Sequence, residues 1–107
     1  MSVTMAVVVN RIIDTSMVNN ATVARICGVN IRSVQRWRLG SVDPKRAALE
    51  RLLELRAVLD LVSAVYRPEG AAIWLRSPVP DLGYSVPVDL IRDGEFMQVI
   101  GCLTRHC

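Results

Sequence analysis

Residues that build enzyme active sites are scarce in this sequence. His106 is the only histidine and is the penultimate residue, and the three cysteines are Cys27, Cys102 and Cys107. None of them has the spacing of a metal-ligand cluster, and the sequence has neither a glycine-rich phosphate loop nor a nucleophile elbow. General acid–base or nucleophilic catalysis needs ionisable groups that converge. The sequence therefore predicts no enzyme, no metal site and no cofactor.

Long apolar runs are also missing. No segment approaches the roughly 20 apolar residues that cross a membrane as a helix. The apolar stretch at residues 3–9 lacks the basic region and the cleavage site of a signal peptide, so we expect a cytoplasmic protein without membrane contact. Only five of the 107 residues are aromatic, whereas 51% are hydrophobic. This balance suits an aliphatic helical core in one compact domain, with or without an appendage.

Acidic residues are scarce in the first part of the chain. Residues 1–46 hold seven basic and two acidic residues, a net charge of +5, whereas residues 47–107 hold six basic and eight acidic residues, a net charge of −2. A basic front and an acidic back predict two surfaces with two different partners, of which the first is a polyanion.

The most informative stretch is residues 20–39, NATVARICGVNIRSVQRWRL. Its first part has the period of a short helix, with Val23, Ala24 and Cys27 on one apolar face. Asn19 is a favourable N-cap for this helix. Gly28 follows the helix, where a residue that tolerates positive φ is needed.

The second part of the stretch predicts another short helix. Asn30 is a favourable N-cap, and Ile31, Val34 and Trp37 repeat as an apolar stripe. Gly40 is expected to end this helix. The rest of the helix surface is polar and basic.

Together the two helices resemble a helix-turn-helix DNA-binding unit. Ala24 is the small residue of the first helix at the crossing point, Gly28 is in the turn four residues later, and apolar Val29 and Val34 follow as the unit requires. The resemblance implies that the second helix enters the major groove. An ordinary helical hairpin with a solvated basic face is the alternative. The predicted DNA-binding residues are Asn30, Arg32, Ser33, Gln35, Arg36, Arg38, Lys45 and Arg46.

The next segment predicts the longest helix, from Asp43-Pro44, with Asp43 as N-cap, to about residue 66. Lys45 and Arg46 would stand in its first turn, where the helix dipole favours acidic residues. A helix start that faces phosphate would explain this basic pair, as would chance. Residues 57–65 are almost wholly apolar, which predicts burial against a second copy of the chain or another protein.

The remaining segments predict an all-α fold. The apolar period predicts a helix at residues 3–14, where the run VVV also permits a strand. Short helices are expected at residues 69–76, 88–92 and 95–103, with Asp93 as a candidate N-cap for the last, and a turn at residues 82–84. The predicted domains are residues 1–43 for DNA binding, 44–66 as a connecting and dimerisation helix, and 67–107 as a C-terminal module.

The C-terminal module resembles the toxin-binding domain of the MbcA/ParS/Xre antitoxins. The resemblance covers residues 15–103 and lies in the order of short motifs behind the helix-turn-helix. The matching motifs are Trp74-Leu75, Ser77-Pro78, Leu82-Gly83, Pro87 with Leu90-Ile91, and Asp93-Gly94 before a helix. Tyr84 stands where many members have a second glycine, and the tail after the last helix is short.

The resemblance implies a function. Members neutralise RES-domain toxins, which consume NAD⁺ or use it to ADP-ribosylate a target, by covering the toxin's active site, and repress their own operon. It implies a cognate RES-domain toxin, operator DNA and a homodimer within a larger assembly as partners, with Arg105 and His106 in the tail nearest the toxin cleft. The implied toxin-binding residues are Trp74, Pro78, Leu82, Gly83, Pro87, Leu90, Ile91, Arg105 and His106. The alternative is a stand-alone Xre-type repressor whose C-terminal half only dimerises.

Overall fold

Seven α-helices and one short 3₁₀ helix make up the part of the chain that the computed structural model describes, residues 5–105. The only β pairing within these residues is an isolated bridge between Val79 and Ser85, so the predicted all-α fold is confirmed. The molecule measures 40 × 23 × 23 Å. The elements are α1 (Met5–Asp14), α2 (Asn20–Cys27), α3 (Ile31–Leu39), α4 (Arg46–Val62), α5 (Pro68–Leu75), η1 (Pro80–Leu82), α6 (Pro87–Arg92) and α7 (Phe96–Thr104).

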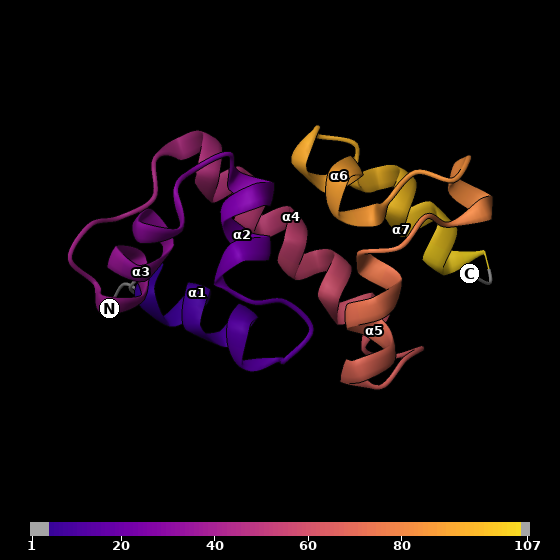
Figure 1. Cartoon of the computed structure of the whole chain (residues 1–107), viewed down its shortest axis with the longest axis horizontal. Helices are drawn as coiled ribbons and strands as arrows, with labels where there is room; N and C mark the ends of the chain where they lie inside the picture. Colours follow the sequence, from indigo (N-terminus) through magenta and orange to yellow (C-terminus); the bar gives the residue numbers. More distant parts are fainter. Residues whose placement is uncertain (1–4, 106–107) are drawn as a thin grey trace.

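Helix α4 occupies the middle of the molecule (Figure 1). On one side of it lie α1, α2 and α3, and on the other lie α5, α6 and α7. Helices α2, α6 and α7 all contact α4, and α2 also contacts α6 directly. The two ends of the chain are therefore joined by packing as well as by the connecting helix.

The ends of α2 and α3 follow the predicted local chemistry. The side chain of Asn19 accepts a hydrogen bond from the backbone N–H of Thr22, and that of Asn30 accepts one from Arg32. Gly28 and Gly40, at the C-termini, have φ of 68° and 77°, the left-handed conformation that glycine adopts without steric cost. These four cap predictions are confirmed.

The predicted bounds of α4 are wrong at both ends. The helix begins at Arg46 with Lys45 in the N-cap position and no side-chain cap, because Asp43 and Pro44 belong to the link without regular secondary structure that follows α3. It ends at Val62 rather than near residue 66, and residues 63–65 form turns. Pro68, at the start of α5, disfavours a helical conformation for the residue before it, so the chain must leave the helix before that point.

The start of α7 also differs from the prediction. Its N-cap position is occupied by Glu95, and Asp93 instead caps the C-terminus of α6. Gly94 between them has φ of 82° and makes the turn. The carboxylate of Asp93 is held by Arg92, at 2.9 Å from Nε, so it does not cap α7.

The interior faces of the helices were predicted only in part. Val34 and Trp37 are buried in α3, but Ile31 is 41% exposed. In α2, Ile26 is buried and Cys27 is half-buried, because this helix contacts α3, α4 and α6 and buries a wider face than one stripe. The apolar second half of α4 is covered by the chain itself, with Val58 fully buried, which removes the argument that it needs a second chain for burial.

Candidate functional sites

The outer face of α3 is open to solvent. Arg32, Gln35 and Arg36 are exposed, as is the cap residue Asn30, and Ser33 is half-buried. Helix α3 has no acidic residue in its first turn. A positive helix end and uncompensated arginines on one face favour contact with an anion.

The start of α4 adds two basic side chains. Lys45 is exposed, and the side chain of Arg46 is 93% exposed and 3.6 Å from Glu50 Oε1. No acidic residue stands in the first turn of α4, so the basic charge lies at the positive end of the helix dipole. This arrangement destabilises the helix start and suits a bound anion.

Arg38 has a different environment from the other predicted DNA-binding residues. Its Nε donates to Asn10 Oδ1 at 2.7 Å, and its Nη1 donates to Asn20 Oδ1 at 3.0 Å. Asn10 Nδ2 in turn donates to the carbonyl oxygen of Arg38 at 3.1 Å. Arg38 therefore ties α3 to α1 and α2, a pair of contacts that the sequence did not reveal.

Some of the predicted toxin-binding residues are buried in the C-terminal module, and others are exposed at its surface. Leu82, Pro87 and Ile91 are buried and hold the C-terminal module together. Half-buried Leu90 packs beside them. The residues available at the surface are Pro78, Gly83 and Arg105, whereas His106 lies outside the described residues.

Trp74 is half-buried, and its ring stacks on that of Tyr66, with 6.1 Å between centroids and 28° between planes. It also packs against Val79, Leu82 and Cys102, which form a second small core cluster. Trp74 is thus part of the module's core and reaches the surface along one edge.

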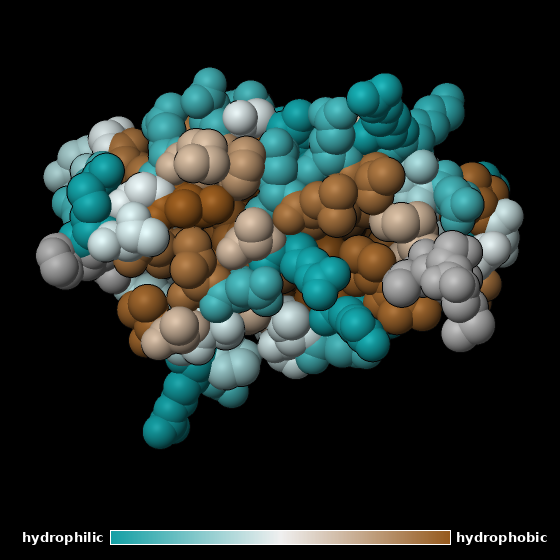
Figure 2. All heavy atoms as spheres, turned by 180° about the vertical axis from the view of Figure 1, so that it is seen from behind, coloured by the Kyte–Doolittle hydropathy of each residue, from teal (hydrophilic) through white to brown (hydrophobic). Residues whose placement is uncertain are grey.

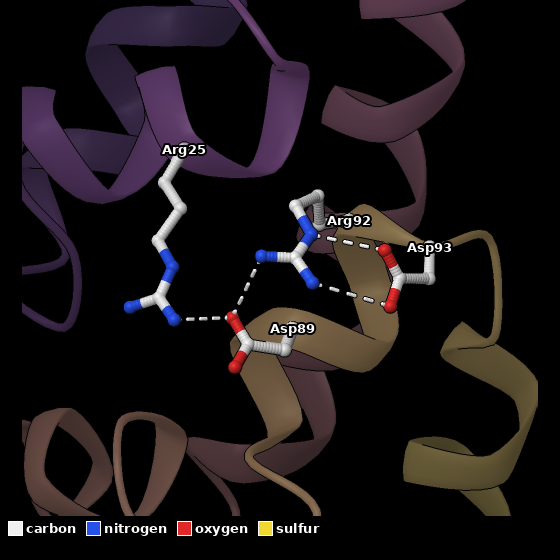
Figure 3. Close-up of polar contacts among 4 residues, drawn as sticks. All are labelled: Arg25, Asp89, Arg92 and Asp93. Carbon is white, nitrogen blue, oxygen red and sulfur yellow. Dashed lines mark hydrogen bonds and ion pairs between the residues drawn. The ribbon is translucent and has the colours of Figure 1, made fainter.

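An ion-pair network that has no signature in the sequence joins α2 to α6 (Figure 3). Arg25 of α2 lies 2.5 Å from Asp89 of α6, and Asp89 is also 3.3 Å from Arg92. Arg92 binds both oxygens of Asp93, and this hydrogen bonding lowers the pKa of Asp93 and raises that of Arg92. Residues 25 and 89 are too far apart in the sequence for a local pattern to predict their contact.

The described residues offer little else that could serve as a reactive or metal-binding site. Burial raises the pKa of the Cys27 thiol from an ordinary 9.0 to about 11, against a smaller opposing effect of Arg51. Within residues 5–105, no group of three or more His, Cys, Asp or Glu side chains could hold a metal ion. No helix in the same range is long and apolar enough to span a membrane.

Known proteins are similar to this chain in sequence. The mycobacterial cidal antitoxin MbcA of Mycobacterium tuberculosis is 38% identical to this chain over 81 residues, and so is that of Mycobacterium bovis. These residues are 76% of this chain and 72% of each relative. The probable mycobacterial cidal antitoxin Rv3188 of M. tuberculosis is 31% identical over 104 residues, with 89% of each chain covered. No protein-family profile matches the sequence.

A solved structure gives the same result. The crystal structure of the M. tuberculosis MbcT–MbcA toxin–antitoxin complex contains a chain that superposes with a TM-score of 0.85 and 33% identity, covering 96% of this chain and 93% of that one. The fold and the relatives define the class: an antitoxin of a toxin–antitoxin system, and not an enzyme. The chain belongs to the MbcA antitoxin family.

Proposed function

We propose that this antitoxin neutralises a RES-domain, NAD⁺-consuming toxin by covering its active site, and that it represses its own operon by binding operator DNA. The observation that carries the proposal is the close similarity to a relative solved in a toxin–antitoxin complex. The C-terminal module supplies the toxin-binding surface in this proposal. The outer face of α3 and the start of α4 supply the DNA-binding face.

The test of neutralisation is co-expression with the protein encoded next to this chain. We expect the two proteins to co-purify, and cellular NAD⁺ to fall only when the antitoxin is left out. If nothing co-purifies and NAD⁺ is unchanged, the alternative function remains, a stand-alone DNA-binding repressor. The exposed basic residues of α3 favour that alternative as much as they favour the main proposal.

Two exposed substitutions separate the two surfaces. Arg36→Ala on α3 should weaken binding to the promoter duplex and leave neutralisation intact. Arg105→Glu, just after α7, should weaken neutralisation and leave DNA binding intact. Both side chains are exposed, so neither substitution removes core packing. A single substitution that abolishes both activities in a folded protein would contradict the division into two surfaces.

We also infer a homodimer that uses the solvent-facing side of α4. Leu53 is 50% exposed there, and Leu49 and Ala57 lie one turn away on the same side of the helix. Figure 2 shows one face of the molecule, on which apolar side chains lie at the surface between hydrophilic ones. Such exposed apolar groups are typical of association surfaces when they gather in a patch.

The dimer is tested by light scattering coupled to size-exclusion chromatography. The wild-type protein should elute with twice the mass of one chain, and Leu53→Glu should give a monomer. Leu39→Glu is the matched control, because Leu39 is 82% exposed but lies at the end of α3. A wild-type monomer, with and without toxin, would contradict this inference.

A further inference from the structure

Helix α3 is fixed in place by a hydrogen-bonded clamp formed by Arg38, Asn10 and Asn20. Three hydrogen bonds of 2.7, 3.0 and 3.1 Å connect the end of α3 to the middle of α1 and the first residue of α2. A guanidinium group is planar and presents its donors as a rigid fork. It can therefore bind two amide oxygens at once and set the angle between the elements that carry them.

We infer that Arg38 is a positioning residue for DNA binding: it orients α3 through Asn10 and Asn20 and does not itself bind phosphate. This inference rests on the proposed DNA-binding function. It extends the DNA-binding machinery to α1, which carries none of the predicted DNA-binding residues.

The geometry distinguishes Arg38 from Arg36 and Arg46. Those two side chains extend into solvent, whereas Arg38 is half-buried and has both Nε and Nη1 committed to the clamp. Arg38 also lines a surface hollow of about 450 Å³ together with Asn10, Asn20, Gln35 and Leu39. If a DNA phosphate entered this hollow, Arg38 would contact it directly. The experiment must therefore distinguish a direct phosphate contact from positioning of α3.

The experiment measures binding to fluorescein-labelled duplexes that tile the promoter of the antitoxin's own operon. Affinity is measured over a range of salt concentrations for the antitoxin alone and for its complex with the toxin. The variants are Arg38→Ala, Arg38→Lys and Asn10→Ala, with Arg46→Ala as the control for a phosphate contact. Each phosphate contact contributes about 0.9 to the slope of log K against log salt.

Positioning predicts that all three clamp variants lose about tenfold in affinity with little change in slope. Arg38→Lys keeps the charge but replaces the planar fork of donors by a single ammonium group, which does not reproduce the geometry of both contacts, so it should not rescue binding. Asn10→Ala removes no charge and should still weaken binding. Arg46→Ala should lower the slope by about 0.9. The inference is overturned by the following result: Asn10→Ala binds the duplex with wild-type affinity, Arg38→Ala reduces the steepness of the salt dependence, and Arg38→Lys restores the wild-type salt dependence.

A second readout does not require DNA. Thermal unfolding of Asn10→Ala, Arg38→Ala and the double variant should be non-additive, because either substitution alone already removes the hydrogen bond between Arg38 Nε and Asn10 Oδ1. If the wild type binds no duplex with or without toxin, the DNA-binding proposal fails. If it binds but the unfolding effects are additive, the clamp does not couple α1 to α3 and this inference fails alone.

Discussion

Tyr84 is a large side chain in a backbone conformation that suits glycine. Its φ is 65°, directly after Gly83 with φ of 63°, and its backbone N–H donates to the carbonyl oxygen of Val79 at 2.9 Å. The side chain is 71% exposed, so packing does not offset the strain. A left-handed conformation costs a residue other than glycine about 1–2 kcal/mol.

We therefore expect Tyr84→Gly to stabilise the protein, by up to about 1 kcal/mol after the greater entropy of an unfolded chain with glycine is included. Tyr84→Ala keeps the strain and loses only an exposed ring, so its stability should be close to that of the wild type. Urea unfolding of the two variants measures the difference. Equal stabilities would show that the backbone of residue 84 is not strained.

Cys27 gives a prediction about pH. Its thiol donates to the carbonyl oxygen of Ala48 at a sulfur–oxygen distance of 3.7 Å, and burial raises its pKa to about 11. The folded state therefore holds this proton between pH 9 and 11, where the unfolded state releases it. Unfolding then releases a proton, so this contribution to stability is complete below pH 9 and is lost as the pH rises to about 11.

The measurement is the pH dependence of the free energy of unfolding for the wild type and for Cys27→Ala. The wild type should lose more stability between pH 9 and 11 than the variant does. Alkylation of Cys27 by iodoacetamide, followed by mass spectrometry of its peptide, should have a midpoint near pH 11. A midpoint near 9 would mean that the thiol is not desolvated.

At the scale of a helix, the start of α4 lacks the residues that normally stabilise a helix N-terminus. Lys45 in the N-cap position offers no acceptor for the free backbone N–H groups, and Arg46 follows it. Aspartate at an N-cap stabilises a helix by about 1 kcal/mol relative to a residue that cannot cap. The proposed DNA-binding role of the basic pair would explain why the less stable sequence is present.

Lys45→Asp should therefore raise the stability by about 1 kcal/mol and weaken binding to the promoter duplex. Lys45→Ser distinguishes the effect of helix capping from the effect of the negative charge. Serine caps the helix, as aspartate does, without adding a negative charge that repels phosphate. Urea unfolding and fluorescence anisotropy measure the two effects. Unchanged DNA affinity in Lys45→Asp would argue that this helix start does not face phosphate.

The helices themselves were predictable where local chemistry decides them. Asn19, Gly28, Asn30 and Gly40 each act through backbone groups within a few residues, and each was predicted correctly. The start of α4 was predicted incorrectly. Asp43-Pro44 is a typical helix start, but these two residues are needed in the link that connects α3 to α4. Local patterns are weakest at such boundaries.

The candidate sites were less predictable than the fold. Periodicity indicated which face of α3 is exposed, but not that Arg38 turns back to Asn10. The burial of Ile26 and the pairing of Arg25 with Asp89 depend on α6 lying against α2. Contacts between residues so distant in the sequence leave no local pattern.

At the scale of the whole molecule, one core serves both proposed surfaces. A single cluster of buried residues includes Val9 of α1, Trp37 of α3, Leu55 of α4 and Leu103 of α7. Surfaces that share a core in this way are expected to unfold together. The ion pair of Arg25 and Asp89 adds little to this, because salt bridges near the surface contribute at most about 1 kcal/mol.

The two tryptophans test this expectation. Trp37 is buried in α3, and Trp74 lies in α5 on the other side of α4. In single-tryptophan variants, Trp37→Phe and Trp74→Phe, the urea transition seen by fluorescence should coincide with that seen by circular dichroism. Separate transitions for the two reporters would mean that the two ends of the chain unfold independently.

The central position of α4 has a consequence for how such a protein would be removed. A protease that cut the chain once within this helix would destroy the support of both proposed surfaces together. Derepression of the operon and release of the toxin would then begin at the same moment, and their timing would be set by one event. A chain built as two separately folded modules would lose one activity while it kept the other.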